Sequence, residues 1–170
     1  MKTGVDEMKM KKVISAVVIS LVCLSFVGCS DNPIQEDLLN YSNKELTKIV
    51  DVENEVIEGF DSVSGDNYTD DETMYYALQN EIIPASLELI EAAERITPST
   101  KEVREIHEIY ISSINHQHSA FIILLSALET QDYGQVNAAN EKMDLARTES
   151  RDFLASLKEL GKENDVEFDN

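Results

Sequence analysis

The chain has 170 residues, a length that suits one domain, and its 33 acidic and 14 basic residues give a formal net charge of −19. No basic patch is available to displace counterions from phosphates, so this composition argues against nucleic-acid binding and against direct docking of the domain on anionic lipid. Tryptophan is absent and proline and glycine are scarce, while Glu, Leu, Ala, Ile and Lys are common, which favours helix.

The first element in the chain is a short apolar run behind a basic start. Three lysines lie close before it: Lys9, Lys11 and Lys12. The run itself, residues 13–27, is interrupted only by a few serines and is shorter than the roughly 20 apolar residues that a membrane-spanning helix needs. A basic region, a short apolar region and a small residue before the cut are typical of a secretory signal. We therefore predict a signal peptide over residues 1–28. Three methionines remain open as its start: Met1, Met8 and Met10.

The apolar run ends in the stretch Phe26-Val27-Gly28-Cys29, in which a cysteine directly follows a small residue. This stretch resembles the lipobox of bacterial lipoproteins, although Phe26 stands where a lipobox usually carries leucine. The chain also resembles the small helical lipoproteins of Gram-positive bacteria that have no assigned activity. The resemblance implies cleavage before Cys29 and a thioether-linked diacylglycerol on its sulfur. Two acyl chains anchor a protein firmly. We therefore expect a lipid-anchored protein on the outer face of the cytoplasmic membrane, with residues 29–33 as a short tether.

Cleavage before Cys29 has two consequences for the mature domain. Cys23 leaves with the signal, so the monomer has no disulfide and depends on its apolar core. The signal also removes four lysines but only two acids, which makes the mature domain still more acidic. Such a surface attracts a basic partner or a cation, and the simpler interpretation is a soluble surface whose charges repel one another.

Beyond the tether, capping residues mark the starts of four expected helices. Asn32 is followed by a proline, which is typical of a helix start. Thr69 and Ser99 each open a capping box that ends in a glutamate three residues later, and Asp132 begins a looser version. A further box at Ser42 leaves open whether the first helix is split there. The predicted helices cover residues 34–63, 70–96, 100–130 and 133–161.

Apolar residues recur in these segments at alternating spacings of three and four, the pattern of helices that pack as in a coiled coil. The connections are short, and short links between long helices force neighbours to run antiparallel. The sequence therefore predicts an all-α domain, an antiparallel up-down four-helix bundle over residues 34–163 that is about 40 Å long. Residues 164–170 are expected to form a frayed polar tail. Pro84 lies inside the second helix, where it should kink the helix and free a carbonyl.

Polar residues interrupt the apolar seams at three positions: Glu53, His107 and Gln117. Alignment of the helices by depth predicts a polar layer in the middle of the bundle, level with Pro84. Its members are Glu53, Gln117, His118 and Arg147. One interpretation is a small polar pocket, and another is a hydrogen-bonded layer that fixes the register of the helices. A third is that Glu53 turns to solvent.

The sequence shows no catalytic constellation, because a nucleophile elbow, a P-loop and a dinucleotide fingerprint are all missing. His116 and His118 are two residues apart and point to opposite sides of a helix, and the acids of the linker 61–72 do not fit an EF-hand frame. We therefore expect no catalytic residue, cofactor or metal site. The expected function is a non-enzymatic binding or scaffold module for another envelope protein. The alternative is a receptor for a small ligand or a metal ion that uses the polar layer.

Overall fold

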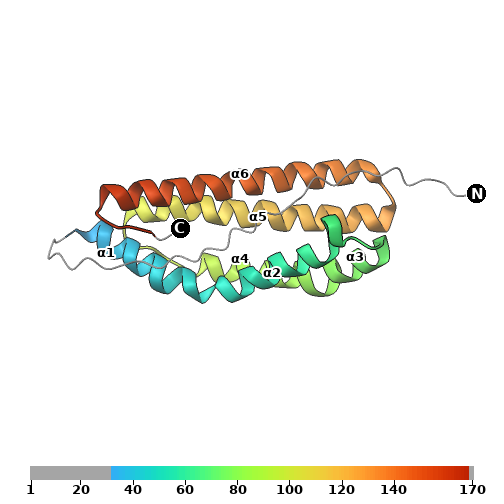
Figure 1. Ribbon diagram of the computed structural model, residues 1–170, viewed down its shortest axis with the longest axis horizontal. Coiled ribbons are helices and arrows are strands. Elements are labelled where there is room, and N and C mark those ends of the chain that lie inside the picture. The colour runs from blue at the N-terminus through green and yellow to red at the C-terminus, as the bar shows by residue number, and fades with distance from the viewer. Residues whose placement is uncertain (1–31, 169–170) are drawn as a thin grey trace, which may run out of the picture.

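The computed structural model describes residues 32–168, which fold almost entirely into helices (Figure 1). In chain order the helices are α1 (Pro33–Asn40), α2 (Val50–Val63), α3 (Asp71–Ala77), α4 (Ile83–Glu94), α5 (Lys101–Thr130) and α6 (Tyr133–Glu163). The prediction of an all-α chain is confirmed. The signal peptide and Cys29 lie outside the described residues. Among the helices that are described, none has the length and apolar character needed to cross a membrane.

The first half of the domain is built from broken helices. A π-helical turn, Tyr41–Glu45, and a 3₁₀ turn, Leu46–Lys48, separate α1 from α2, so the first predicted helix is split at the box that begins with Ser42. A second π-helical turn, Leu78–Ile82, joins α3 to α4 directly before Pro84. Proline has no N–H to donate to the preceding turn, and the N–H of Ile83 bonds the carbonyl of Leu78 five residues back. The predicted break at Pro84 therefore takes the form of a π-helical turn.

The second half is a hairpin of two uninterrupted helices, α5 with 30 residues and α6 with 31, which lie side by side (Figure 1). Small buried residues recur every seven positions on the facing sides: Ser113, Ala120 and Ala127 on α5, and Ala139 and Ala146 on α6. The Ser113 hydroxyl donates to the backbone carbonyl of Ala146 at 2.9 Å. A side-chain bond of this kind requires the two backbones to approach closely, which the small residues allow.

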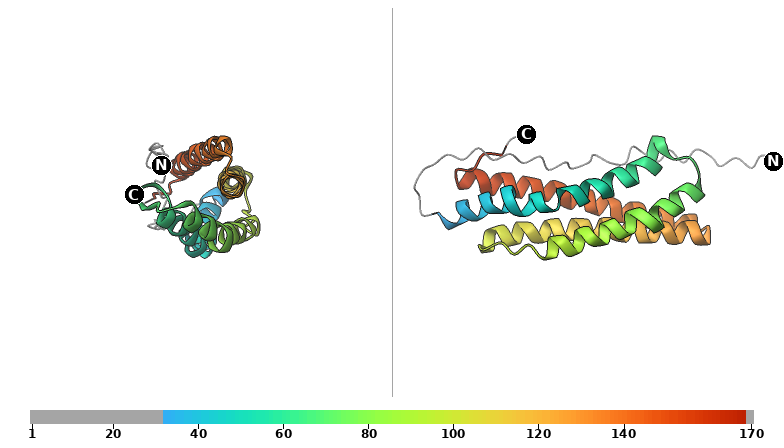
Figure 2. Two further views of the ribbon diagram at one scale, coloured as in Figure 1. Left: turned by 90° about the vertical axis from the view of Figure 1, so that its right-hand side faces the viewer. Right: turned by 90° about the horizontal axis from the view of Figure 1, so that it is seen from below.

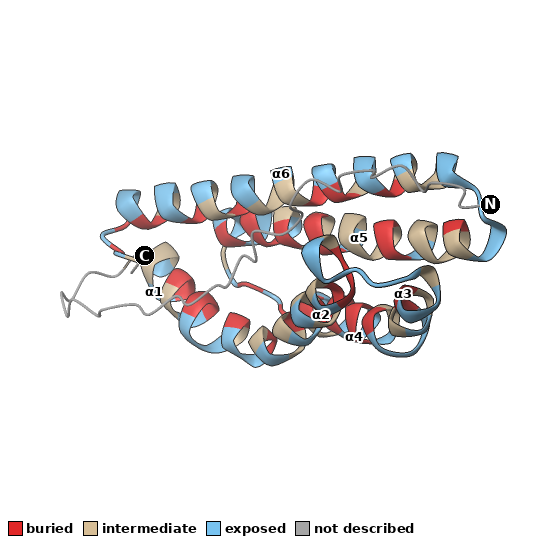
Figure 3. Ribbon diagram, turned by 45° about the vertical axis from the view of Figure 1, so that its right-hand side comes forward, coloured by how far each residue is buried: buried red, intermediate tan, exposed pale blue. Residues whose placement is uncertain are grey.

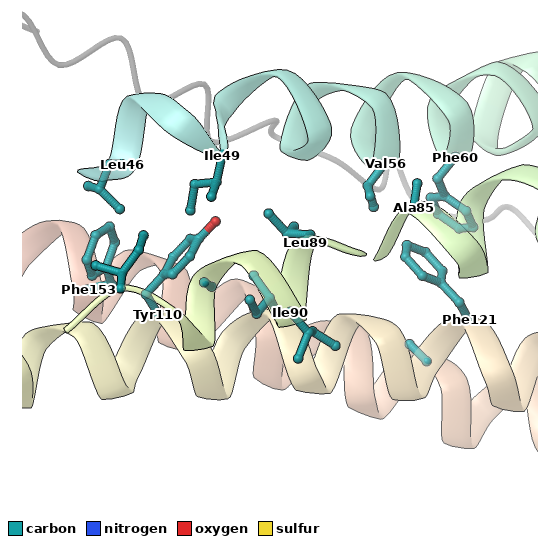
Figure 4. Close-up of a cluster of buried hydrophobic side chains, with 14 of the residues drawn as sticks. Leu46, Ile49, Val56, Phe60, Ala85, Leu89, Ile90, Tyr110, Phe121 and Phe153 are labelled. Atoms are coloured by element: carbon teal, nitrogen blue, oxygen red, sulfur yellow. The ribbon is translucent and has the colours of Figure 1, made fainter. Parts of the chain in front are cut away.

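The two halves share one hydrophobic core. Figure 3 shows buried residues on the sides of the helices that face one another and exposed residues on the outer sides. Phe60 of α2 packs on Phe121 of α5 with ring centroids 5.0 Å apart, and Tyr110 packs on Phe153 of α6 at 5.2 Å (Figure 4). Phe121 is fully buried. The first of these aromatic pairs ties the broken helices to the continuous hairpin, and the second joins the two helices of the hairpin.

Two helix starts differ from the predicted capping boxes. Asn32 caps α1 as predicted, with its side-chain oxygen accepting from the N–H of Ile34 at 3.1 Å. The N-cap residue of α3 is Asp70 rather than the predicted Thr69. The side chain of Asp70 accepts from the N–H of Thr73 at 2.7 Å. Asp70 satisfies one of the free N–H groups that every helix start leaves.

The two residues before α5 are held by another helix. Thr100 is the N-cap residue, but neither it nor Ser99 supplies a capping side chain, so the capping box predicted at Ser99 is wrong. Asp37 of α1 is buried and accepts from the N–H of Ser99 at 3.0 Å, from the N–H of Thr100 at 2.7 Å and from the Thr100 hydroxyl at 2.7 Å. These charge-assisted bonds tie the connection before α5 to α1.

The molecule has two distinct ends. At the near end lie the start of α1, the start of α5 and the end of α6, and at the far end lie the start of α3, the end of α5 and the start of α6 (Figures 1 and 2). Cys29 precedes Pro33 by four residues, which span at most about 14 Å when fully extended. The lipid anchor predicted at Cys29 would therefore lie at the near end. The 30 residues of α5 rise about 45 Å, so the far end lies well away from the near end.

Candidate functional site

Glu53 of α2 lies inside the protein, with 9% of its surface exposed. The Tyr110 hydroxyl donates to its carboxyl oxygen at 3.0 Å. Burial raises the pKa of Glu53 to about 7, and the hydrogen bond from Tyr110 offsets only part of this rise. The interpretation in which Glu53 turns to solvent is therefore wrong, because a long tyrosine reaches across from α5 to meet it.

His107 forms a second buried contact near the first π-helical turn. Its Nδ1 lies 2.9 Å from the Tyr41 hydroxyl, and its Nε2 lies 3.0 Å from the carbonyl oxygen of Ala93. A carbonyl only accepts, so Nε2 carries the hydrogen and the Tyr41 hydroxyl donates to Nδ1. Burial lowers the pKa of His107, which favours this neutral form. The contact joins three helical segments and leaves no free ring nitrogen for a ligand.

The other residues of the predicted polar layer bond elsewhere. His118 Nδ1 lies 2.7 Å from the hydroxyl of Ser86 on α4. Arg147 donates to Asp144 of its own helix at 2.7 Å. Gln117 is half-buried on α5. Their hydrogen bonds therefore do not bring Gln117, His118 and Arg147 together with Glu53 into one network.

The depth alignment placed Glu53 too far along the domain. Phe60 and Phe121 are in contact, and α2 and α5 both run from the near end to the far end (Figure 4). Seven residues before this pair lie Glu53 and Ile114. Glu53 is therefore about one helical turn closer to the near end than His118 is, which puts it within reach of Tyr110.

His116 and His118 point apart, as their spacing predicts. His116 faces α6, where its Nδ1 lies 2.7 Å from Glu149, and His118 faces α4. The hydroxyl of Ser112 donates to the other oxygen of Glu149 at 2.8 Å. In residues 32–168, no three side chains of the His, Cys, Asp or Glu type gather as they would around a metal ion. The two bonds to Glu149 cross-link α5 and α6, and the bond of His118 links α5 to α4.

A small internal cavity lies between the two halves, away from the polar residues described above. It has a volume of about 20 Å³ and is enclosed mainly by apolar side chains, among them Phe60, Phe121 and Met143. This is room for about one water molecule. The pocket predicted beside Pro84 does not coincide with it, since none of the four residues of the predicted layer touches this cavity.

An open groove lies at the far end, between α3 and the end of α5. Its volume is about 440 Å³. Tyrosines and acids make up most of its wall: Asp71, Glu72, Tyr75, Tyr76, Leu128, Glu129 and Gln131. We call these seven residues the tyrosine groove. The two helix ends that form it come from different halves of the chain.

The tyrosines of this end are held in defined positions. The Tyr75 hydroxyl donates to Glu129 at 3.2 Å. The rings of Tyr75 and Tyr76 make an edge-to-face contact, with centroids 5.5 Å apart. The Tyr68 hydroxyl donates to Asp71 at 2.6 Å. Partial burial, together with this bond to Asp71, raises the pKa of Tyr68 to about 12. Tyr68 therefore remains a neutral donor across the physiological pH range.

Much of this aromatic surface faces solvent. Tyr76 is 53% exposed and Tyr133, at the start of α6, is 60% exposed. Sequence reasoning treated the acids of this region as caps and missed the groove. One signal was available: four of the six tyrosines of the chain, at 68, 75, 76 and 133, fall beside the two connections that meet at the far end.

The sequence matches the family described as EMYY-motif containing lipoprotein over residues 10–150. The chain belongs to this family. No curated protein and no solved structure gave a match. The match includes Cys29 and confirms a bacterial lipoprotein, a membrane-anchored extracytoplasmic protein held by lipid.

The letters of the family motif have a counterpart in α3 of this lipoprotein. Met74, Tyr75 and Tyr76 repeat its last three letters, Thr73 precedes them, and Glu72 lies one position further back. Met74 is buried with 2% of its surface exposed, which fixes α3 against the core, whereas Tyr75 and Tyr76 belong to the groove wall. The motif region thus joins the core to the tyrosine groove.

Proposed function

We propose that this lipoprotein is a non-enzymatic binding or scaffold module that docks another envelope protein at its far end. Lipid on Cys29 holds it on the outer face of the cytoplasmic membrane, and an antiparallel up-down four-helix bundle serves as the spacer. The single observation that carries the proposal is the tyrosine groove, which lies at the end remote from the anchor.

Exposed aromatic residues support docking at this place. Six large apolar or aromatic side chains are exposed in the described part of the chain, and three of them, Tyr68, Tyr76 and Tyr133, lie at the far end. Tyrosine is enriched at protein interfaces, because it offers a large apolar ring and a hydroxyl at a small cost in conformational entropy. The net charge of −19 argues against nucleic acid as the partner.

The length of the domain supports a spacer role. The straight hairpin of α5 and α6 raises the groove about 45 Å above the near end, beyond the headgroups of the membrane to which the lipid is attached. The buried contacts of Glu53 and His107 stiffen the middle of the domain and do not open to solvent. A partner in the envelope therefore meets the far end first.

Site-specific photo-crosslinking in the native membrane tests the proposal. A photoreactive residue at position 76 should capture one discrete envelope protein, and the same residue at position 87 should not. Leu87 is the matched control, since it is 48% exposed but lies on α4, away from the groove. Capture should be lost when Tyr75→Ala is added. Equal capture at both positions, or none at position 76, would contradict docking at the far end.

A further inference from the structure

We propose, resting on the docking function above, that the occupant of the tyrosine groove is a basic segment of polypeptide. An arginine or lysine side chain of that segment stacks on Tyr76 and pairs with Glu72 and Glu129. Three features of the groove favour such an occupant: its charge, the position of its rings, and the end of the helix that borders it.

The charge of the groove has one sign. Three of its seven residues are acids, Asp71, Glu72 and Glu129, and none is Lys, Arg or His. Glu72 and Glu129 are exposed, so both remain available to a partner. A depression bounded by acids concentrates a negative potential and attracts a positively charged group.

The rings of the groove suit a cation as well. Tyr75 is tied to Glu129 by its hydroxyl and braces Tyr76 through the edge-to-face contact. Tyr76 therefore has a fixed ring, and 53% of its surface is open. The face of an aromatic ring attracts a guanidinium or ammonium group, and guanidinium also stacks flat on it.

The end of α5 adds a further negative contribution. The helix ends at Thr130, and Gln131 follows in the left-handed conformation with φ of 55°. The last carbonyls of a helix carry a partial negative charge, and the residues at this end that line the groove are Leu128, Glu129 and Gln131. The opposite helix starts at this end are already neutralised, because the acids Asp70 and Asp132 cap α3 and α6.

Other occupants fit less well. Anionic lipid and nucleic acid would place like charges together. A second copy of this chain would bring its own acids against these acids, on a surface that already carries −19. A metal ion needs several ligands at bonding distance, and the acids of the groove do not gather in that way within residues 32–168.

Binding of defined peptides to the full-length lipoprotein in neutral vesicles tests the proposal. The probes are a 12-residue peptide of alternating arginine and serine, the same peptide with lysine for arginine, and the same peptide with glutamine for arginine. The arginine peptide should bind best and the glutamine peptide should not bind. Tyr76→Ala should weaken arginine-peptide binding about fivefold, since one exposed cation–π contact is lost. Tyr76→Phe keeps the ring and should bind nearly as the wild type does.

Matched controls separate the groove from the general negative charge. The double variant Glu72→Gln with Glu129→Gln should weaken binding about tenfold, by removing two exposed ion pairs. Glu88→Gln and Leu87→Ala, at exposed positions of α4, should leave binding unchanged. Raising the salt concentration should weaken the wild type more than the double variant.

Three results would overturn the basic-segment proposal. In the first, Glu88→Gln weakens binding as much as a groove variant does, which indicates diffuse charge attraction. In the second, the glutamine peptide binds as well as the arginine peptide. In the third, spermidine or calcium ions displace the arginine peptide from the wild type at concentrations at which they bind the double variant poorly, which assigns the groove to a small cation. If position 76 still captures its envelope protein in any of these cases, docking stands and only the basic chemistry fails.

Discussion

The two halves of this lipoprotein differ in how regular their helices are. The hairpin of α5 and α6 has no break in 30 and 31 residues, and small residues every seven positions let its backbones approach. The half made by α1 to α4 has two π-helical turns and two 3₁₀ turns, Leu46–Lys48 and Gly65–Asn67, and it carries the buried side chains of Tyr41 and Glu53.

The irregular half keeps a continuous buried face in spite of its breaks. After the turn at Tyr41–Glu45 the buried residues follow at spacings of three and four: Leu46, Ile49, Glu53 and Val56. Glu53 is therefore buried because it occupies an apolar position of this face. The small buried residues of the regular half follow a seven-residue spacing.

Replacing the buried acid of the irregular half should have the largest effect. The folded protein keeps the proton of Glu53 until about pH 7, whereas the unfolded chain releases it near 4.5. The stabilising contribution of protonated Glu53 is complete below pH 4.5 and is lost as the pH rises through 7. The loss amounts to about 3 kcal/mol of unfolding free energy. We expect Glu53→Gln to remove this pH dependence and to be the more stable protein at pH 8.

Urea denaturation followed by circular dichroism between pH 4.5 and 8 measures the difference. Glu58→Gln, at an exposed position of the same helix, is the control and should follow the wild type. Parallel curves for the wild type and Glu53→Gln would show that burial of Glu53 does not govern its protonation.

Filling the close seam of the regular half should have the next largest effect. Ala146→Leu places a larger side chain where the Ser113 hydroxyl meets the backbone of α6. Overpacking of this kind costs about 1–3 kcal/mol. Ala155→Leu makes the same change at an exposed position of α6 and should shift stability by less than about 0.5 kcal/mol. Thermal melts of both variants test this, and equal melting temperatures would argue against close backbone packing.

Removing the Asp37 contact that links the halves should have the smallest effect. Asp37→Ala leaves the N–H groups of Ser99 and Thr100 without their acceptor and should lower stability by about 1–2 kcal/mol. Amide hydrogen exchange should speed up at Ser99 and Thr100, far from the mutation in sequence. Glu36→Ala, at the exposed neighbouring position, should leave this exchange unchanged. Slow exchange in both variants would mean that Asp37 does not protect these two amides.

Local patterns in the sequence were enough for several features of the fold. The all-α class, the cap at Asn32 and the break before Pro84 depend on residues within one or two helical turns of each other. The interior position of Glu53 followed from its place in an apolar seam. The lipobox-like stretch that ends at Cys29 predicted the lipoprotein family to which the chain belongs.

The tertiary structure alone decided which of these residues meet. Asp37 binds the backbone of Thr100, 63 residues later, Glu53 pairs with Tyr110 rather than with His118, and Tyr75 bonds Glu129 across the groove. Each of these contacts depends on the relative height and rotation of two helices, and one π-helical turn changes both. Residue spacing within a helix fixes which face is apolar. The heights at which two such faces pack are fixed by side-chain contacts between the helices, such as Phe60 on Phe121, which spacing within one helix does not encode.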